Sequence, residues 1–145
     1  MGTQTVIDDN PKLDVRDWTG TNPVRIVLDK SGRIPEDYFV KDGSVKTIII
    51  TENQNLKNST SVFFENCIFD NTLPFSIVSI LQQYDIQSLL IEGGKQTLQT
   101  FIDAGLWDEA RVFKGAVTLQ SGTAAPFITG TLQEKQTILN DELLI

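Results

Sequence analysis

The stretch from residue 89 to residue 98, Leu-Leu-Ile-Glu-Gly-Gly-Lys-Gln-Thr-Leu, constrains the fold more than any other part of the chain. Residues 89–91 form a continuous apolar run, which is typical of a strand covered on both faces. Gly93 and Gly94 follow Glu92, and their lack of a side chain allows a sharp turn and a close approach of the backbone to a ligand. The pattern therefore predicts a buried central strand that ends at Glu92 and turns into a helix.

The residues after the glycine pair have helical periodicity. Apolar or small residues recur at i, i+3, i+4 and i+7 on one face, at Leu98, Phe101, Ile102 and Gly105. The unpaired N–H groups and the dipole of the first turn favour a phosphate group there. A Gly-Gly link also serves packing alone, and Glu92 could be either a ligand-site carboxylate or a helix-start carboxylate, so both interpretations stay open at this point.

Local patterns predict the remaining elements. We expect strands over residues 24–29, 46–51, 62–65 and 108–114, a helix from Pro74 to about Tyr84, and a closing antiparallel pair over residues 132–139 and 143–145. Residues 1–7 resemble the end of a strand and its turn. The order predicts one α/β domain over residues 1–145, with a mixed, mainly parallel sheet flanked by helices and a C-terminal antiparallel hairpin.

Composition narrows the classes of function. With 12 Lys and Arg against 19 Asp and Glu, the net charge of −7 disfavours nucleic acid and anionic membranes as partners. The absence of histidine excludes Ser-His and Cys-His nucleophiles and ordinary zinc sites, so we expect no metal. No apolar run approaches the ~18 residues of a membrane span and no signal peptide is visible, so the expected location is cytoplasmic.

Three stretches, taken in order, resemble a known family. They are residues 5–16 (TVIDDNPKLDVR), residues 22–29 (NPVRIVLD), and residues 91–109, which run from IEGG to AGLWDE. Their order and spacing are similar to those of the reductase domain of the bifunctional riboflavin-biosynthesis deaminase/reductase, which has a dihydrofolate-reductase-like fold. The resemblance covers nearly the whole chain.

The resemblance implies a reaction and its partners. The family reduces the ribosyl group of 5-amino-6-(5-phosphoribosylamino)uracil to a ribityl group with NADPH, and the hydride goes to the sugar C1′. The cofactor supplies this chemistry, while the protein supplies binding, orientation and electrostatics. The resemblance also implies a small phosphoribosylaminopyrimidine as substrate and a homo-oligomer, most simply a dimer.

The resemblance further implies site residues. The cofactor contacts would be Thr5, Asp9, Gly93, Gly94, Lys95, Gln96, Thr97, Leu98 and Thr100, and the substrate contacts Leu13, Arg16 and Glu92. Asp9 and Glu92 would be the catalytic pair. The negative charge of Asp9 would favour an incipient cationic imine, and Glu92 could accept hydrogen bonds from the substrate. The planar guanidinium of Arg16 suits a phosphate. Without the resemblance, Asp9 is a turn residue and Arg16 a surface arginine.

The chain departs from the family pattern at two places, and it matches only part of the family's length. Lys30 stands where a small hydroxyl residue is common, so Lys30 or Arg33 could meet the 2′-phosphate of NADPH or be solvated loop charges. Lys95 and Gln96 replace a Pro-Thr pair. The opening part of the reductase domain and the whole deaminase domain have no counterpart, so we expect a piece of a larger enzyme that is weakly active or inactive alone.

Two other functions stay open. The same fold could serve as a non-catalytic module for dimer assembly or ligand binding. It could also belong to another dihydrofolate-reductase-like enzyme that acts on a different pterin or pyrimidine. The sequence preceding residue 1 in the gene would discriminate, because a zinc-deaminase signature there would indicate the riboflavin pathway. Arg25 alternates with core positions and is predicted to be structural.

Overall fold

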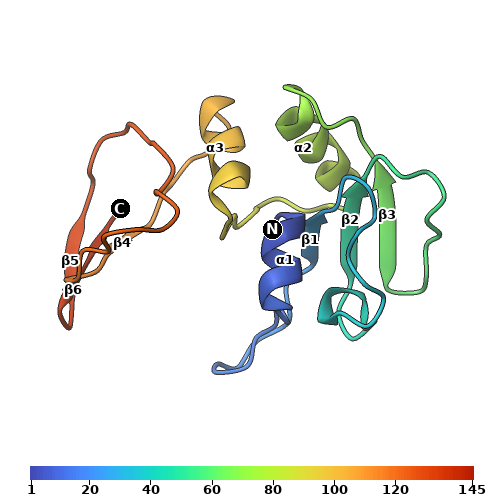
Figure 1. Ribbon diagram of the computed structural model, residues 1–145, viewed down its shortest axis with the longest axis horizontal. Helices are drawn as coiled ribbons and strands as arrows, with labels where there is room; N and C mark the ends of the chain where they lie inside the picture. The colour runs from blue at the N-terminus through green and yellow to red at the C-terminus, as the bar shows by residue number, and fades with distance from the viewer.

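A three-stranded parallel sheet forms the body of the computed structural model, which describes residues 1–145 (Figure 1). Its strands are β1 (Arg25–Leu28), β2 (Thr47–Thr51) and β3 (Val62–Asn66), in the order β1-β2-β3. Ile48 of β2 lies opposite Ile26 of β1 and Phe63 of β3. All three strands were expected from their β-branched and aromatic residues, and their existence is confirmed.

The central strand β2 sends side chains to both faces of the sheet. All five of its residues are buried, because Ile48 and Ile50 point to one face and Ile49 to the other. The first face carries α2 (Leu73–Gln83) and Phe101 of α3 (Lys95–Asp103). The second face carries α1 (Thr3–Asp9) and the short 3-10 helix η1 (Phe39–Lys41). The expected helices from Pro74 and after Gly94 are both present.

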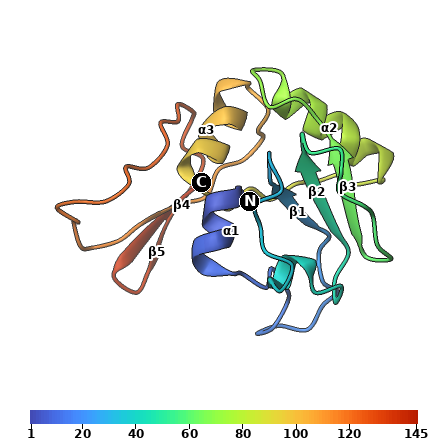
Figure 2. The same cartoon turned by 45° about the vertical axis from the view of Figure 1, so that its right-hand side comes forward.

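The C-terminal strands form a separate antiparallel sheet. Strands β4 (Val112–Lys114), β5 (Lys135–Ile138) and β6 (Asp141–Leu144) pair in the order β4-β6-β5. This sheet lies beyond α3, away from the parallel sheet (Figures 1 and 2). The predicted hairpin is confirmed as β5–β6, and the α/β class is confirmed. The parallel and antiparallel parts are two sheets instead of one mixed sheet.

The expectation of a strand end over residues 1–7 is wrong. Residues 3–9 form α1, in which the N–H of Val6 donates to the carbonyl of Gly2 at 3.1 Å. Val6 is fully buried against Val27 of β1, so tertiary packing outweighs the weak helix propensity of the Thr-Val-Ile stretch. Of this stretch, only Gly2 bridges to β1, in parallel with Leu28.

The expectation of a central buried strand at residues 89–91 is also wrong. These residues belong to no strand, and Leu90 is 81% exposed. The outer edge of β1 already has a partner, because the Met1 amine donates to the Ile26 carbonyl and the Leu28 N–H donates to the Met1 carbonyl, both at 2.9 Å. An apolar run indicates burial but does not supply an edge to pair with. The Glu92-Gly93-Gly94 turn into α3 is nevertheless present, and its Gly93–Gly94 peptide bond is cis.

Candidate functional site

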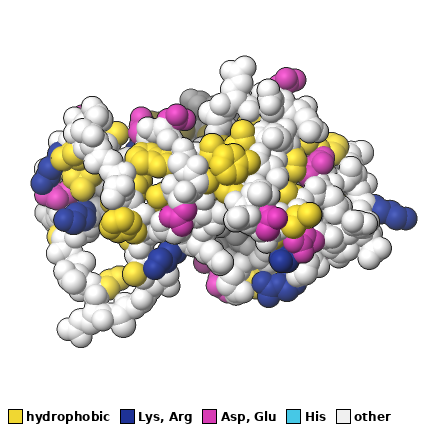
Figure 3. Space-filling view, turned by 90° about the horizontal axis from the view of Figure 1, so that it is seen from above, with side chains coloured by type: hydrophobic (Ala, Val, Ile, Leu, Met, Phe, Trp, Pro, Cys, Tyr) yellow, Lys and Arg dark blue, Asp and Glu magenta, His cyan; other side chains and the backbone are white.

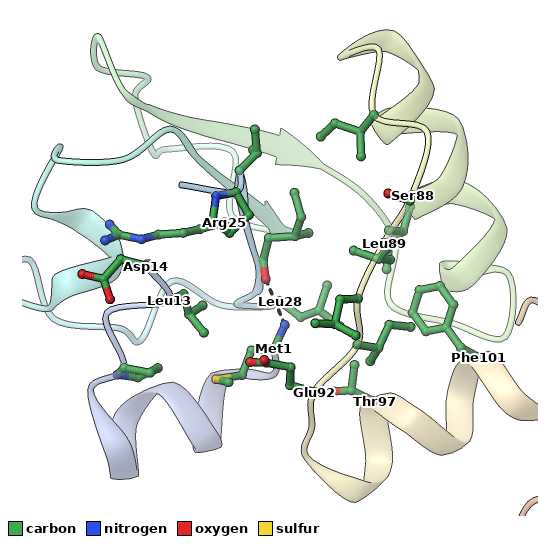
Figure 4. A pocket seen from close by; sticks show the side chains of 18 of the residues that line it. Met1, Leu13, Asp14, Arg25, Leu28, Ser88, Leu89, Glu92, Thr97 and Phe101 are labelled. Atoms are coloured by element: carbon green, nitrogen blue, oxygen red, sulfur yellow. Dashed lines mark hydrogen bonds between the residues drawn. The ribbon is translucent and has the colours of Figure 1, made fainter. Parts of the chain in front are cut away.

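A cleft of about 690 Å³ opens between β1, the loop after α1 and the segment that leads into α3 (Figure 4). Hydrophobic side chains make up most of its lining, as is usual for small-molecule sites. The polar and charged side chains on its walls are Asp14, Arg16, Arg25, Ser88, Glu92 and Thr97. The cleft thus places a few charged groups around an apolar surface.

The three residues expected to contact substrate all line this one cleft. Leu13 and Arg16 come from the loop after α1, and Glu92 comes from the segment before α3. Figure 4 shows Glu92 between Met1 and Thr97, with Leu13 beyond Met1. The fold therefore brings together residues that are distant in the chain. An arginine and a carboxylate that line one apolar cleft from different segments can bind an anionic group and a hydroxyl or amine of the same ligand.

Sequence analysis missed Asp14, which forms an ion pair with Arg16. The Arg16 Nη2 lies 3.1 Å from the Asp14 Oδ1, with the two side chains 59% and 25% exposed. The sequence offered only the opposite charges of two residues close in the chain, because residues 11–16 form no strand and Leu13 has a left-handed φ of 47°. Asp14 neutralises part of the charge that Arg16 offers, so an anionic ligand at Arg16 would compete with this carboxylate.

The first turns of α1 and α3 approach each other closely. A Cβ added at Gly94 would lie 3.1 Å from the Thr5 Oγ1, and one added at Gly2 would lie 3.0 Å from the Thr97 Oγ1. Gly94 has a φ of −74°, which any residue can adopt, so the tight contact with the Thr5 hydroxyl, and not the backbone conformation, disfavours a side chain here. Three of the residues predicted to contact cofactor, Thr5, Gly94 and Thr97, are therefore neighbours.

Other predicted cofactor contacts lie outside the cleft lining. Lys30 pairs with Glu52 at 3.5 Å, and its Nζ is 6.0 Å from the centre of the Phe69 ring. Asp9 is exposed at the last position of α1.

The remaining predicted contacts follow Glu92. Gly93 is buried in the turn, and Leu98 is half-buried on α3. Lys95 and Gln96 are exposed in the first turn of α3, and the Thr100 hydroxyl donates to the Gln96 carbonyl at 2.8 Å. The structure thus gathers only part of the expected cofactor set.

Arg25 is structural, as predicted, although it also borders the cleft. Its side chain is 1% exposed, and its Nη1 donates to the Phe39 carbonyl at 2.7 Å and to the Asp42 Oδ1 at 3.0 Å. Burial alone would raise the pKa of Asp42, but hydrogen bonds from Ser44 and Arg25 lower that pKa below its ordinary value. The guanidinium thereby joins β1 to the segment that contains η1.

Two structural findings concern metal binding and membrane spans, neither of which the sequence predicts. No three His, Cys, Asp or Glu side chains gather closely enough to hold a metal ion. None of the helices has the length and apolar character that crossing a membrane requires.

The comparison with known protein families shows to which family the chain belongs. A family model described as the RibD C-terminal domain matches residues 1–142. The chain belongs to the RibD C-terminal domain family. Among curated relatives of this RibD family, the riboflavin biosynthesis protein RibD of Aquifex aeolicus is 33% identical over 117 residues, which are 78% of this chain and 33% of that protein.

A second relative and a solved structure agree with the RibD assignment. The 2,5-diamino-6-ribosylamino-4(3H)-pyrimidinone 5′-phosphate reductase of Aquifex aeolicus is 30% identical over 137 residues, covering 90% of this chain and 61% of that protein. The deaminase/5-amino-6-(5-phosphoribosylamino)uracil reductase of Thermotoga maritima has a TM-score of 0.79 at 26% identity, over 99% of this chain and 42% of that chain. The chain thus spans between a third and three-fifths of these relatives, and the dihydrofolate-reductase-like fold expected from the resemblance is confirmed.

Proposed function

We propose that the full-length protein reduces 5-amino-6-(5-phosphoribosylamino)uracil with NADPH and that the cleft holds this substrate. The observation that carries the proposal is the convergence of Leu13, Arg16 and Glu92 on one apolar cleft. Membership of the RibD C-terminal domain family supports the reaction, because relatives of this family carry the names of pyrimidine phosphate reductases. The net negative charge makes a local cation such as Arg16 necessary for an anionic substrate.

Each cleft residue has a role in the proposal. Arg16 holds the 5′-phosphate of the substrate, and binding displaces part of its contact with Asp14. Glu92 accepts hydrogen bonds from the sugar hydroxyls or the pyrimidine amine, and Leu13 packs against the apolar part of the ligand. The resemblance pairs Asp9 with Glu92, but Asp9 is exposed at the last position of α1 and outside the cleft lining. The proposal therefore assigns to Glu92 alone the negative charge near the reacting carbon, where a cationic imine develops.

The start of α3 fits the phosphate groups of a dinucleotide. Gly94 carries no side chain that would block a phosphate, the Thr5 hydroxyl lies beside it, and the Thr97 hydroxyl lies beside Gly2. N–H groups at a helix start donate to phosphate oxygens, with help from the helix dipole. The other residues predicted at this site are Gly93, Lys95, Gln96, Leu98, Thr100 and, from the loop after β1, Lys30. When bound, NADPH supplies the hydride, while the protein residues bind and orient both ligands.

A direct test measures NADPH consumption by the full-length protein with the pathway substrate. We expect loss of NADPH that depends on the substrate and stops when the substrate is exhausted, with NADH a poorer donor. Binding of NADPH without turnover would instead favour the non-catalytic module. Turnover only with a different pterin or pyrimidine would favour the other dihydrofolate-reductase-like enzyme.

We also infer that two copies associate through the C-terminal sheet. Its large side chains are unusually exposed, including Phe113 at 66% and Leu139 at 94%, and Leu143 is the one buried residue of its three strands. Figure 3 shows hydrophobic side chains at the surface of this end of the molecule. Such an apolar surface is typical of a protein interface. Sedimentation showing monomer only at tens of micromolar, roughly the range of weak self-association, would contradict this inference.

A further inference from the structure

We propose that Asn10 is a positioning residue for the substrate loop, residues 11–16, which it ties to Phe39 of η1. The inference rests on the proposed function, because it concerns how Leu13 and Arg16 are held at the cleft. The loop lies outside every helix and strand. Its position therefore depends on side-chain contacts and not on the regular backbone hydrogen bonds of a helix or sheet.

Asn10 ends α1 and redirects the chain. Its φ of 40° and ψ of 57° are left-handed, a conformation that asparagine tolerates better than most residues. Its N–H donates to the Val6 carbonyl, and its Oδ1 accepts the Phe39 N–H, both at 2.9 Å. One residue thus closes the helix, sets the direction into Pro11 and fixes the start of the substrate loop to η1.

Phe39 is held from its other side by Arg25. The Phe39 carbonyl accepts the Arg25 Nη1–H at 2.7 Å, and the Arg25 side chain is almost fully buried. A second contact runs from the loop, because the Lys12 Nζ lies 4.9 Å from the centre of the Phe39 ring. Figure 2 shows η1, in cyan, close to the C-terminal end of α1. Phe39 therefore gives the loop a fixed support that is anchored in β1.

The far end of the loop is tied as well, since the Val15 N–H donates to the Asn22 Oδ1 at 2.9 Å. Leu13 lies between these two contacts, and Arg16 directly follows Val15. Displacing a binding group from its productive position weakens binding even when the group itself is unchanged. Loss of the Asn10 contact should therefore weaken substrate binding without removing any group that touches substrate.

The experiment compares variants of Asn10 in the full-length protein. Asn10→Gly keeps the left-handed conformation but removes the oxygen that accepts the Phe39 N–H, whereas Asn10→Asp keeps both. Asn58→Ala is the matched control, because the Asn58 Oδ1 accepts the Phe64 N–H at 2.8 Å and lies outside the cleft lining. We expect Asn10→Gly to raise the substrate KM by about fivefold, the effect of one ordinary hydrogen bond, with a smaller change in kcat. Asn10→Asp should restore the KM, and Asn58→Ala should change the melting temperature only.

Amide hydrogen exchange of the ligand-free protein separates this inference from the proposed function. Exchange of residues 11–16 should be faster in Asn10→Gly than in wild type or Asn10→Asp, whereas exchange in β2 should be unchanged. Absence of reductase activity in the wild type would defeat the proposed function but leave this structural result intact. If Asn10→Gly behaves like Asn58→Ala, with a lower melting temperature but wild-type KM and loop exchange, the positioning role is overturned.

Discussion

Arg16→Ala perturbs the proposed phosphate contact most directly. A charge-assisted hydrogen bond contributes about 1.5–3 kcal/mol, which corresponds to roughly 10- to 150-fold in affinity. The Arg16 side chain is 59% exposed and shares its charge with Asp14, so solvent and the ion pair both reduce the effect. We therefore expect the substrate KM to rise by about tenfold, at the lower end of that range, with little change in NADPH affinity.

The assay is steady-state kinetics of the full-length protein at several salt concentrations. Salt screens the attraction between the exposed Arg16 and the phosphate, which only wild type has, so the difference between wild type and Arg16→Ala should shrink as ionic strength rises. Arg111→Ala is the matched control, because Arg111 is 66% exposed and also pairs with a carboxylate two residues earlier, Glu109 at 2.6 Å, far from the cleft. An unchanged KM in Arg16→Ala, or an equal rise in both variants, would refute the assignment of Arg16 to the phosphate.

Three further predictions test other parts of the molecule. Gly94→Val should weaken NADPH binding by about tenfold or more, measured by fluorescence titration, because a branched side chain would crowd the Thr5 hydroxyl and block the approach of a phosphate to the start of α3. Wild-type affinity would contradict this prediction. Asp14→Asn should lower the substrate KM, because it frees Arg16 from its competing partner. Burial and the hydrogen bond to Glu65 raise the pKa of Tyr84 from 10.0 to about 12. The raised value means that this contact stabilises the fold below pH 10 and is lost toward pH 12, so the stability difference from Tyr84→Phe should shrink over that interval.

The sequence predicted those elements whose stability is visible in local patterns. β2 is a run of β-branched residues and is fully buried, and α2 begins at Leu73 with the expected Pro74 in its first turn. Residues 3–9 could not be predicted as a helix, because the burial of Val6 against β1 depends on a contact distant in the chain. The prediction of a strand at residues 89–91 was wrong for a related reason. A pattern of apolar residues does not show whether a neighbouring strand has a free edge with which to pair.

The candidate site was predictable in its residue types but not in its arrangement. The family resemblance supplied Leu13, Arg16 and Glu92, and only the fold shows that they line one cleft. The contacts that hold the segment of Leu13 and Arg16 in place could not be predicted from the sequence. The hydrogen bond from the Phe39 N–H to Asn10 joins separate segments of the chain, so no local pattern indicates it.

The central claim is that Glu92 acts on a substrate in the cleft and not merely as a carboxylate at the start of α3. Glu92→Gln keeps the shape and removes the charge, so kinetics and a melting curve on the same full-length sample distinguish the two roles. If Glu92 acts on the substrate, Glu92→Gln should have a lower kcat, a smaller change in NADPH affinity and a nearly unchanged melting temperature. Unchanged kcat and KM with a lowered melting temperature would contradict it.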